Sequence, residues 1–152
     1  GHVCCPAASG VPCSCGATGH VEPVASGPAI LAEYLRLGGR PCRPDGSPVD
    51  GADVDRLARQ GVAPACQAQA RALGEVLGSM CNMLDPDVVV LSGSVAQCGP
   101  SWSDALHEAF AGQAMGPVSD TPIVGGLLGG SAPLVGAAEN FVRSGYGSQL
   151  GR

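Results

Sequence analysis

The opening segment of the chain, GHVCCPAASGVPCSCGATGHVEP, combines four cysteines and two histidines with three prolines in 23 residues. Proline lacks an amide donor and glycine leaves the backbone unrestrained, so a segment this rich in both forms neither a helix nor a strand. Regular secondary structure therefore cannot order it. A metal ion held by the sulfur and nitrogen donors can order this segment, and the need to bring these donors together constrains how the chain folds.

The spacing of these donors favours zinc. Structural Zn²⁺ sites have four nitrogen or sulfur ligands at the corners of a tetrahedron. Two of the cysteines are one residue apart, and Gly16 directly after them permits the turn that brings both thiolates inward. The predicted ligands are His2, Cys13, Cys15 and His20. Cys4 and Cys5 are competing thiols. Two alternatives stay open, namely a reduced cysteine-rich loop without metal and a disulfide between neighbouring cysteines.

Composition excludes several classes of protein. The chain has 152 residues, of which 45% are hydrophobic and 14% charged, and this favours a folded domain over disorder. Its net charge is −5 and all eight basic residues are arginines, so we expect no nucleic acid partner for this segment. The apolar stretch MLDPDVVVLSGSVA is broken by charge and glycine, so we expect no membrane span.

The eight cysteines are unevenly distributed, with four in the first fifteen residues and the others scattered singly. This pattern suits a local metal site and core thiols better than a disulfide scaffold. We therefore expect a reducing, cytoplasmic location. The chain begins without methionine and in the middle of a motif, so we expect a further segment before Gly1.

Beyond the opening segment, the hydrophobic pattern predicts helices and short apolar strands, as in α/β folds. The expected helices cover residues 26–37, 52–61, 64–84, 101–110 and a last segment ending near 142. The helix over 64–84 carries a stripe predicted to be buried, made of Cys66, Ala70, Leu73, Leu77, Met80, Cys81 and Leu84. The run over 88–91 is fully apolar, which predicts a central strand, and a second strand is expected over about 123–128.

Serines are expected to cap two of these helices. Ser26 precedes the first helix, and the SWSD sequence from Ser101 to Asp104 resembles a capping box. Trp102, the only tryptophan, is expected to pack at that helix start rather than to bind a ligand.

A turn with one glycine, Ser92-Gly93-Ser94, follows the first expected strand. In open α/β sheets, ligands bind at the carboxyl ends of the strands, and glycine there lets the backbone come close to a ligand. The pattern taken alone also fits an ordinary turn.

The opening motif resembles the signature of the ROK family, which comprises repressors, open reading frames and kinases. In that family a Gly-His pair precedes C-x-C-G-x-x-G-C-x-E and a helix that begins with A-S-G. The matching residues are Gly1, His2, Cys13, Cys15, Gly16, Gly19, Glu22, Ala25, Ser26 and Gly27. His20 differs, because the family usually has a third cysteine there. DPDVVVLSGSV resembles the family's strand and turn beside the nucleotide, although only Gly93 of three glycines is kept. The sequence from Gly136 to Ala138 fits the family's last helix.

This resemblance implies the C-terminal half of a bacterial glucokinase-like sugar kinase. The implied fold is that of an actin-like ATPase (ribonuclease H-like) with an inserted zinc-binding loop. Residues 1–25 would form the zinc-binding and sugar-facing loop, residues 26–145 the C-terminal α/β lobe, and residues 146–152 a frayed tail. By the same resemblance, His2 and Glu22 would contact the sugar. The nucleotide contacts would be Ser92, Gly93 and Ser94.

The resemblance further implies ATP-dependent phosphorylation of glucose or a related hexose at the 6-hydroxyl, with Mg²⁺ beside the ATP and zinc in a structural role. The family's D-x-G-G-T phosphate turn has no counterpart in these residues. Neither does the N-D pair whose aspartate acts as general base. We therefore expect the base to precede Gly1, the chain alone to be inactive, and the full-length kinase to be a homo-oligomer.

Three other interpretations stay open. The chain could be the effector-binding half of a sugar-responsive repressor of the same family, with its DNA-binding helices before Gly1. It could be a degenerate, non-catalytic paralogue, because the family pattern is altered at His20, Ser92, Ser94 and Val62. It could also be a zinc-binding module unrelated to sugar.

Overall fold

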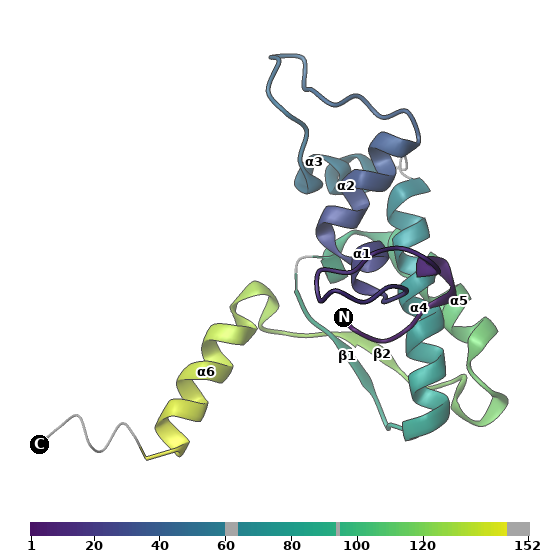
Figure 1. Ribbon diagram of the computed structural model, residues 1–152. Helices are drawn as coiled ribbons and strands as arrows, with labels where there is room; N and C mark the ends of the chain where they lie inside the picture. The colour runs from purple at the N-terminus through teal and green to yellow at the C-terminus, as the bar shows by residue number, and fades with distance from the viewer. Residues whose placement is uncertain (60–63, 94, 146–152) are drawn as a thin grey trace, which may run out of the picture.

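The computed structural model describes residues 1–59, 64–93 and 95–145 (Figure 1). Its α-helices are α1 (Glu22–Ala25), α2 (Gly27–Arg36), α3 (Gly51–Arg59), α4 (Pro64–Leu84), α5 (Pro100–Gln113) and α6 (Ala132–Arg143). Single turns of 3₁₀ helix lie at Pro6–Ala8, Val95–Gln97, Gly116–Val118 and Gly129–Ser131. The strands are β1 (Val89–Leu91) and β2 (Ile123–Gly125). Among the described residues, no helix has the length and hydropathy needed to cross a bilayer.

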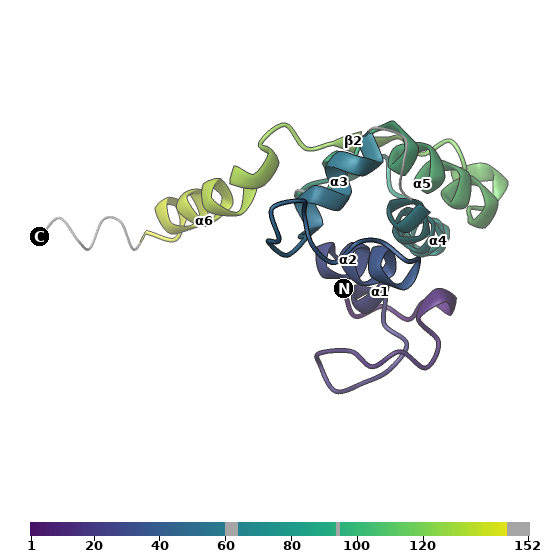
Figure 2. The ribbon, with the colours of Figure 1, turned by 90° about the horizontal axis from the view of Figure 1, so that it is seen from above.

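The long helix α4 runs through the middle of the molecule and packs along α5 (Figures 1 and 2). Its bounds are those predicted, because proline suits the first turn and Asp85-Pro86 ends the helix. Two glycines allow the close contact with α5. A Cβ atom added at Gly74 would lie 3.0 Å from the Ala109 Cβ, and one at Gly78 would lie 2.8 Å from the Gln113 Cβ.

The predicted stripe on α4 is only partly buried. Cys66, Ala70 and Cys81 are buried, but Met80 is 37% exposed and Leu84 is 67% exposed. The buried surface of α4 consists mainly of small residues, listed as Ala65, Cys66, Gln69, Ala70, Ala72, Gly74, Val76, Gly78 and Cys81. Gly74 and Gly78 lie in the close contact with α5, whereas Ala72 and Val76 pack against the opening loop, and the large residues at the end of the helix stay exposed.

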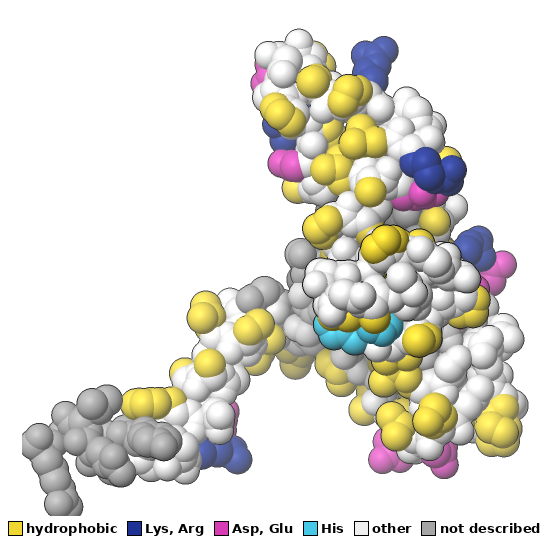
Figure 3. Space-filling model, in the orientation of Figure 1, with side chains coloured by type: hydrophobic (Ala, Val, Ile, Leu, Met, Phe, Trp, Pro, Cys, Tyr) yellow, Lys and Arg dark blue, Asp and Glu magenta, His cyan; other side chains and the backbone are white. Residues whose placement is uncertain are grey.

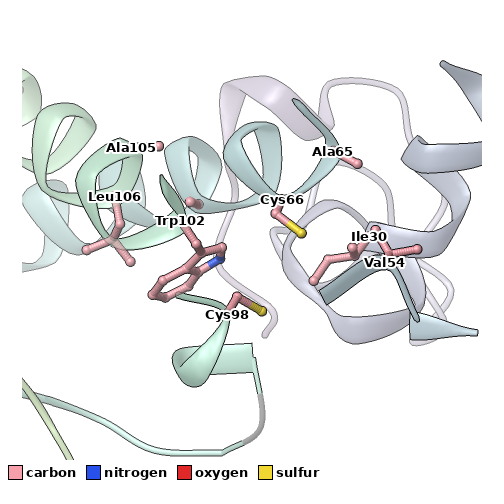
Figure 4. Close-up of a cluster of buried hydrophobic side chains, with 9 residues drawn as sticks. Ile30, Val54, Ala65, Cys66, Cys98, Trp102, Ala105 and Leu106 are labelled. Carbon is pink, nitrogen blue, oxygen red and sulfur yellow. The ribbon is translucent and has the colours of Figure 1, made fainter. Parts of the chain in front are cut away.

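The main hydrophobic core lies where α2, α3, α4 and α5 meet (Figure 4). Trp102 packs there with 3% of its surface exposed, as its position predicts. Its indole N–H donates to Gln69, whose amide nitrogen in turn donates to the carbonyl oxygen of Ala25 at 2.7 Å. The buried members are Ile30, Val54, Ala65, Cys66, Ala70, Cys98, Trp102, Ala105 and Leu106.

The two predicted serine caps are wrong in detail. Helix α5 begins at Pro100 with Gly99 as its N-cap, and no side chain caps it. Proline is favoured at a first helical position, so the helix begins one residue before the predicted Ser101. Ser26 does occupy the N-cap of α2, but its side chain makes no capping hydrogen bond.

The strands β1 and β2 are parallel, with Val89 opposite Ile123 and Leu91 opposite Gly125, and α5 lies between them in the sequence. In the described part of the chain β1 has this one partner, and Val90 is 59% exposed. The prediction of a central strand is therefore not met within the described residues. Strand β2 also ends earlier than predicted, because the chain turns after Gly125 into the 3₁₀ turn before α6.

Helix α6 extends away from the other elements in both views (Figures 1 and 2). None of its residues is buried. Its apolar side chains recur at helical spacing, and Leu134 and Val142 are 76% and 72% exposed.

Candidate metal centre

The predicted ligands come together in the structure. One donor atom from each of four residues lies within 4.8 Å of the other three, and these residues are His2, Cys13, Cys15 and His20. The Cys13 sulfur lies 3.6 Å from the His2 Nδ1 atom, and the Cys15 sulfur lies 3.3 Å from the His20 Nδ1 atom. The two imidazole rings approach edge to face, with 5.3 Å between centroids.

These distances fit a tetrahedral zinc site. With Zn–S bonds of about 2.3 Å and Zn–N bonds of about 2.0 Å, a tetrahedron places sulfur and nitrogen ligands about 3.5 Å apart. The two measured sulfur–nitrogen distances are close to this value. A donor set of two imidazoles and two thiolates is also one that zinc accepts. The residues present therefore fit the metal that the sequence predicts.

Short-range hydrogen bonds fold the loop around this point. The amide of Gly16 donates to the Cys13 carbonyl at 3.0 Å, which closes a tight turn that carries both ligand cysteines. Gly16 has a φ of +90°, a value that residues with a side chain rarely adopt. Isolated bridges pair Pro12 with Thr18 and Cys4 with His20, so three stretches of the loop lie side by side.

One side of the loop is anchored to α4 by a small hydrophobic cluster. Its buried members are Cys5, Ala8, Val21, Ala72 and Val76. All eight cysteines lie in the described part of the chain, and each is a thiol rather than half of a disulfide. The opposite side of the loop faces solvent, where the histidine atoms visible in Figure 3 form one patch.

Glu22, the first residue of α1, lies next to the ligands. Its Oε2 atom is 3.7 Å from the Cys13 sulfur and 3.4 Å from the Ser14 hydroxyl. Gly1 packs directly on it, because a Cβ atom at Gly1 would lie 3.4 Å from the Glu22 Cβ, and the Glu22 amide donates to the Gly1 carbonyl at 2.9 Å. The Gly-His pair therefore lies directly beside Glu22.

The predicted nucleotide turn lies at the carboxyl ends of the two strands. Gly93 has a φ of +103° and open space around it. The Ser92 hydroxyl donates to the Gly129 carbonyl at 3.3 Å, so the turn after β1 contacts the turn after β2. Ser94 and Val62 lie outside the described residues, and so does the predicted tail over 146–152.

The second turn at this edge, over 126–131, was not predicted as part of a site. The amide of Gly126 donates to the Leu91 carbonyl at 2.7 Å, which joins the turn to the end of β1. A Cβ atom at Gly126 would lie 3.4 Å from the Leu91 oxygen and from the Ser92 Cβ, so this turn packs against the end of β1. The glycine-rich sequence GLLGGS predicts a turn here, but its place beside the end of β1 depends on the pairing of the two strands.

The metal loop and the sheet edge are joined by one short helix. Glu22 begins α1, and α2 begins at Gly27, where an added Cβ atom would lie 3.9 Å from the Val95 side chain. Helix α1 has four residues, and at 1.5 Å per residue it is about 6 Å long. Glu22 is therefore held close to the segment that follows β1.

Comparison with known proteins shows what this arrangement is similar to. The sequence model of the ROK family matches residues 1–143. An N-acetylmannosamine kinase of Yersinia pestis (strain Pestoides F) is 44% identical over 89 residues, which is 57% of this chain and 28% of that kinase.

Solved structures agree with this match. A ROK family glucokinase from Streptomyces griseus, in complex with glucose and AMPPNP, has a TM-score of 0.72 and 28% identity, covering 91% of this chain and 49% of that chain. A ROK family transcriptional regulator, a homologue of the E. coli MLC protein, has a TM-score of 0.66 and 24% identity, covering 82% of this chain and 33% of that chain. The second likeness is one of fold alone.

The chain spans less than half the length of each of these relatives. Its structural neighbours include ROK sugar kinases, and its own helices and parallel strands form a small α/β arrangement. With the family match over 1–143, the predicted resemblance is confirmed, and the chain belongs to the ROK family.

Proposed function

We propose that the chain is the C-terminal part of an ATP-dependent ROK sugar kinase that phosphorylates glucose or a related hexose at the 6-hydroxyl. One observation carries this proposal. The His2 imidazole and the Glu22 carboxylate both approach the Cys13 sulfur, at 3.6 and 3.7 Å. An imidazole and a carboxylate are thus adjacent on the solvent side of the metal centre, where they suit the hydroxyl groups of a sugar.

Each residue has a defined part in this proposal. The Nδ1 atom of His2 faces the metal ligands, so its Nε2 atom, on the opposite edge of the ring, is available to a hydroxyl. The Glu22 carboxylate accepts hydrogen bonds from two sugar hydroxyls and thereby fixes the orientation of the sugar ring. Bound zinc would act structurally, by holding the pose of its four ligands.

The nucleotide is proposed to bind at the edge where β1 and β2 end. Gly93 leaves room for a phosphate or a ribose close to the backbone, and the exposed Ser92 hydroxyl is proposed to contact it. Ser94 stays a prediction from the sequence. The short helix α1 joins this edge to Glu22, which brings sugar and donor together, as transfer requires. The general base is proposed to lie outside this chain.

The sugar is proposed to be a hexose or an N-acetylhexosamine. The curated relative phosphorylates N-acetylmannosamine, according to its name, and the solved glucokinase holds glucose. Glucose is the first candidate because the opening motif resembles that of glucokinases. N-acetylmannosamine is the second, favoured by the higher identity of its kinase.

The test is a coupled assay of ATP turnover by the full-length protein with each sugar. We expect turnover with at least one sugar, and no turnover by residues 1–152 alone. Glu22→Gln removes a charged acceptor, worth about 1.5–3 kcal/mol, and should raise the KM for sugar about 10- to 100-fold. Glu139→Gln, on the exposed helix α6, is the matched control and should leave the KM unchanged.

Other outcomes would replace the proposal. Sugar binding without turnover, with a helix-turn-helix encoded before Gly1, would indicate a repressor. Sugar binding without turnover and without such a segment would indicate a degenerate paralogue. No calorimetric heat with either sugar, in protein that carries zinc, would indicate a metal-binding module unrelated to sugar.

A further inference from the structure

The opening loop contains more soft donors than one tetrahedral site needs. Besides the four ligands, Cys4 and Cys5 lie in the same loop. The structure distinguishes these two thiols. Cys5 is 4% exposed and packs against the cluster that includes Val21 and Val76, so it is turned away from the ligands. Cys4 is an exposed thiol.

The backbone places Cys4 directly opposite the ligand His20. The two residues form an antiparallel bridge. The amide of Val21 donates to the Val3 carbonyl at 2.8 Å, and the amide of Cys5 donates to the Gly19 carbonyl at 2.9 Å. These two bonds flank the pair, so it is of the non-hydrogen-bonded type, with Cα atoms about 4.5 Å apart and both side chains on one face. Since His20 points to the ligand cluster, Cys4 lies on the side of the metal.

Cys4 is a neighbour of the site and not one of the four mutually close donors. Its side chain is exposed and belongs to none of the buried hydrophobic clusters, so close packing does not fix its χ1 angle. The ligand that it faces, His20, is itself only half-buried. Zinc accepts either a thiolate sulfur or an imidazole nitrogen as a ligand. A four-coordinate site has room for one of the two, Cys4 or His20, at this position.

We propose that Cys4 is a reserve ligand of the metal site, able to take the corner that His20 occupies. This inference rests on the proposed metal centre. In the exchange the metal–nitrogen bond to His20 breaks, a metal–sulfur bond to Cys4 forms, and the thiol proton goes to solvent. The coordination number stays at four. The donor set changes from two thiolates and two imidazoles to three thiolates and one imidazole.

Cobalt reports this change directly, because sulfur-to-cobalt charge-transfer absorption grows with the number of bound thiolates. The full-length protein is loaded with Co²⁺ and compared with His20→Ala, Cys4→Ser and the double variant. Cys42→Ser, at an exposed cysteine in another loop, is the matched control. His20→Asn is measured in parallel, in case the alanine variant fails to fold.

The wild-type protein, C4S and C42S should show the same absorption. H20A or H20N should show about 1.5-fold more, because three thiolates replace two. Adding C4S to either His20 variant should remove this gain and weaken cobalt binding at least about tenfold. Equal spectra and equal affinities with and without Cys4 in the His20 variants would overturn the reserve ligand while leaving the metal centre intact. A wild-type protein that binds neither cobalt nor zinc would overturn the metal centre itself.

Discussion

Replacing Gly74 of α4 by alanine should destabilise the protein, although alanine is the better helix former. The added methyl group would overlap the backbone carbonyl of Leu106 and come within 3.0 Å of the Phe110 amide nitrogen. These are backbone atoms of α5, so they cannot rotate away, and the two helices must separate. Overpacking costs about 1–3 kcal/mol, whereas the gain in helix propensity is about 1 kcal/mol. Because the closest atom is backbone, we expect the upper part of this range and a net loss of about 2 kcal/mol.

Two further glycines set the scale for this prediction. Gly112 lies in α5 with open space around it, so Gly112→Ala should stabilise by about 0.5–1 kcal/mol. Gly78 is intermediate, because an added Cβ atom would lie 2.8 Å from the Gln113 Cβ and 3.0 Å from the Ala114 amide nitrogen, which are less severe contacts than the one between Gly74 and the Leu106 carbonyl. The expected order of stability is G112A above wild type, then G78A, then G74A.

Urea denaturation followed by circular dichroism measures this order. In thermal denaturation of a chain of about 150 residues, a loss of 2 kcal/mol in the free energy of unfolding lowers the melting temperature by about 4–8 °C. If G74A is as stable as the wild type, α4 and α5 do not make this close contact. If G112A is destabilised as much as G74A, the loss comes from removing glycine as such and not from the helix contact.

Three further predictions concern acid stability, a buried amide and the metal. The Arg43 guanidinium, followed by the Asp50 amide, lowers the pKa of the Asp53 carboxyl to about 2, compared with about 4 in an unfolded chain. Its contribution is therefore present above about pH 4 and lost as the pH falls through 2, and Asp53→Asn should remove this slope from denaturation curves measured against pH. Gln69→Leu leaves the indole N–H of Trp102 without its partner and should cost at least about 2 kcal/mol by urea denaturation; an unchanged midpoint would contradict this. Chelation of bound zinc should speed amide exchange over residues 1–21 while α4 stays protected. An exchange rate over 1–21 that is the same before and after chelation would show that the loop does not need the metal.

The sequence predicts the parts of this fold that depend on local signals. Pro64 and the Asp85-Pro86 pair mark both ends of α4. Proline fixes φ and lacks an amide donor whatever surrounds it, so its effect on a helix can be predicted from the sequence. The four ligands also lie within 20 residues of one another, and the glycine turn between them restricts how the loop can close. Their convergence could therefore be predicted before the structure was known.

What the sequence does not predict is contact between distant elements. Glycine is a poor helix former, yet in the structure Gly74 and Gly78 are where α5 comes closest to α4. The predicted stripe places Met80 and Leu84 in the core because large apolar residues recur there, but close packing favours small residues instead. The periodicity of apolar residues predicts which face of a helix is buried, but it does not predict how closely the neighbouring helix packs against that face.

Apart from its internal backbone hydrogen bonds, the opening loop makes few apolar contacts outside the metal site. Its buried apolar members are Cys5, Ala8 and Val21, which attach one side of the loop to α4. The other side carries the ligands and meets solvent, with Cys15 and His2 exposed. Structural zinc sites contribute about 10 kcal/mol or more, which exceeds what three small buried side chains supply. The metal would therefore determine whether His2 and Glu22 stay adjacent, so sugar affinity and metal content should fall together when zinc is removed.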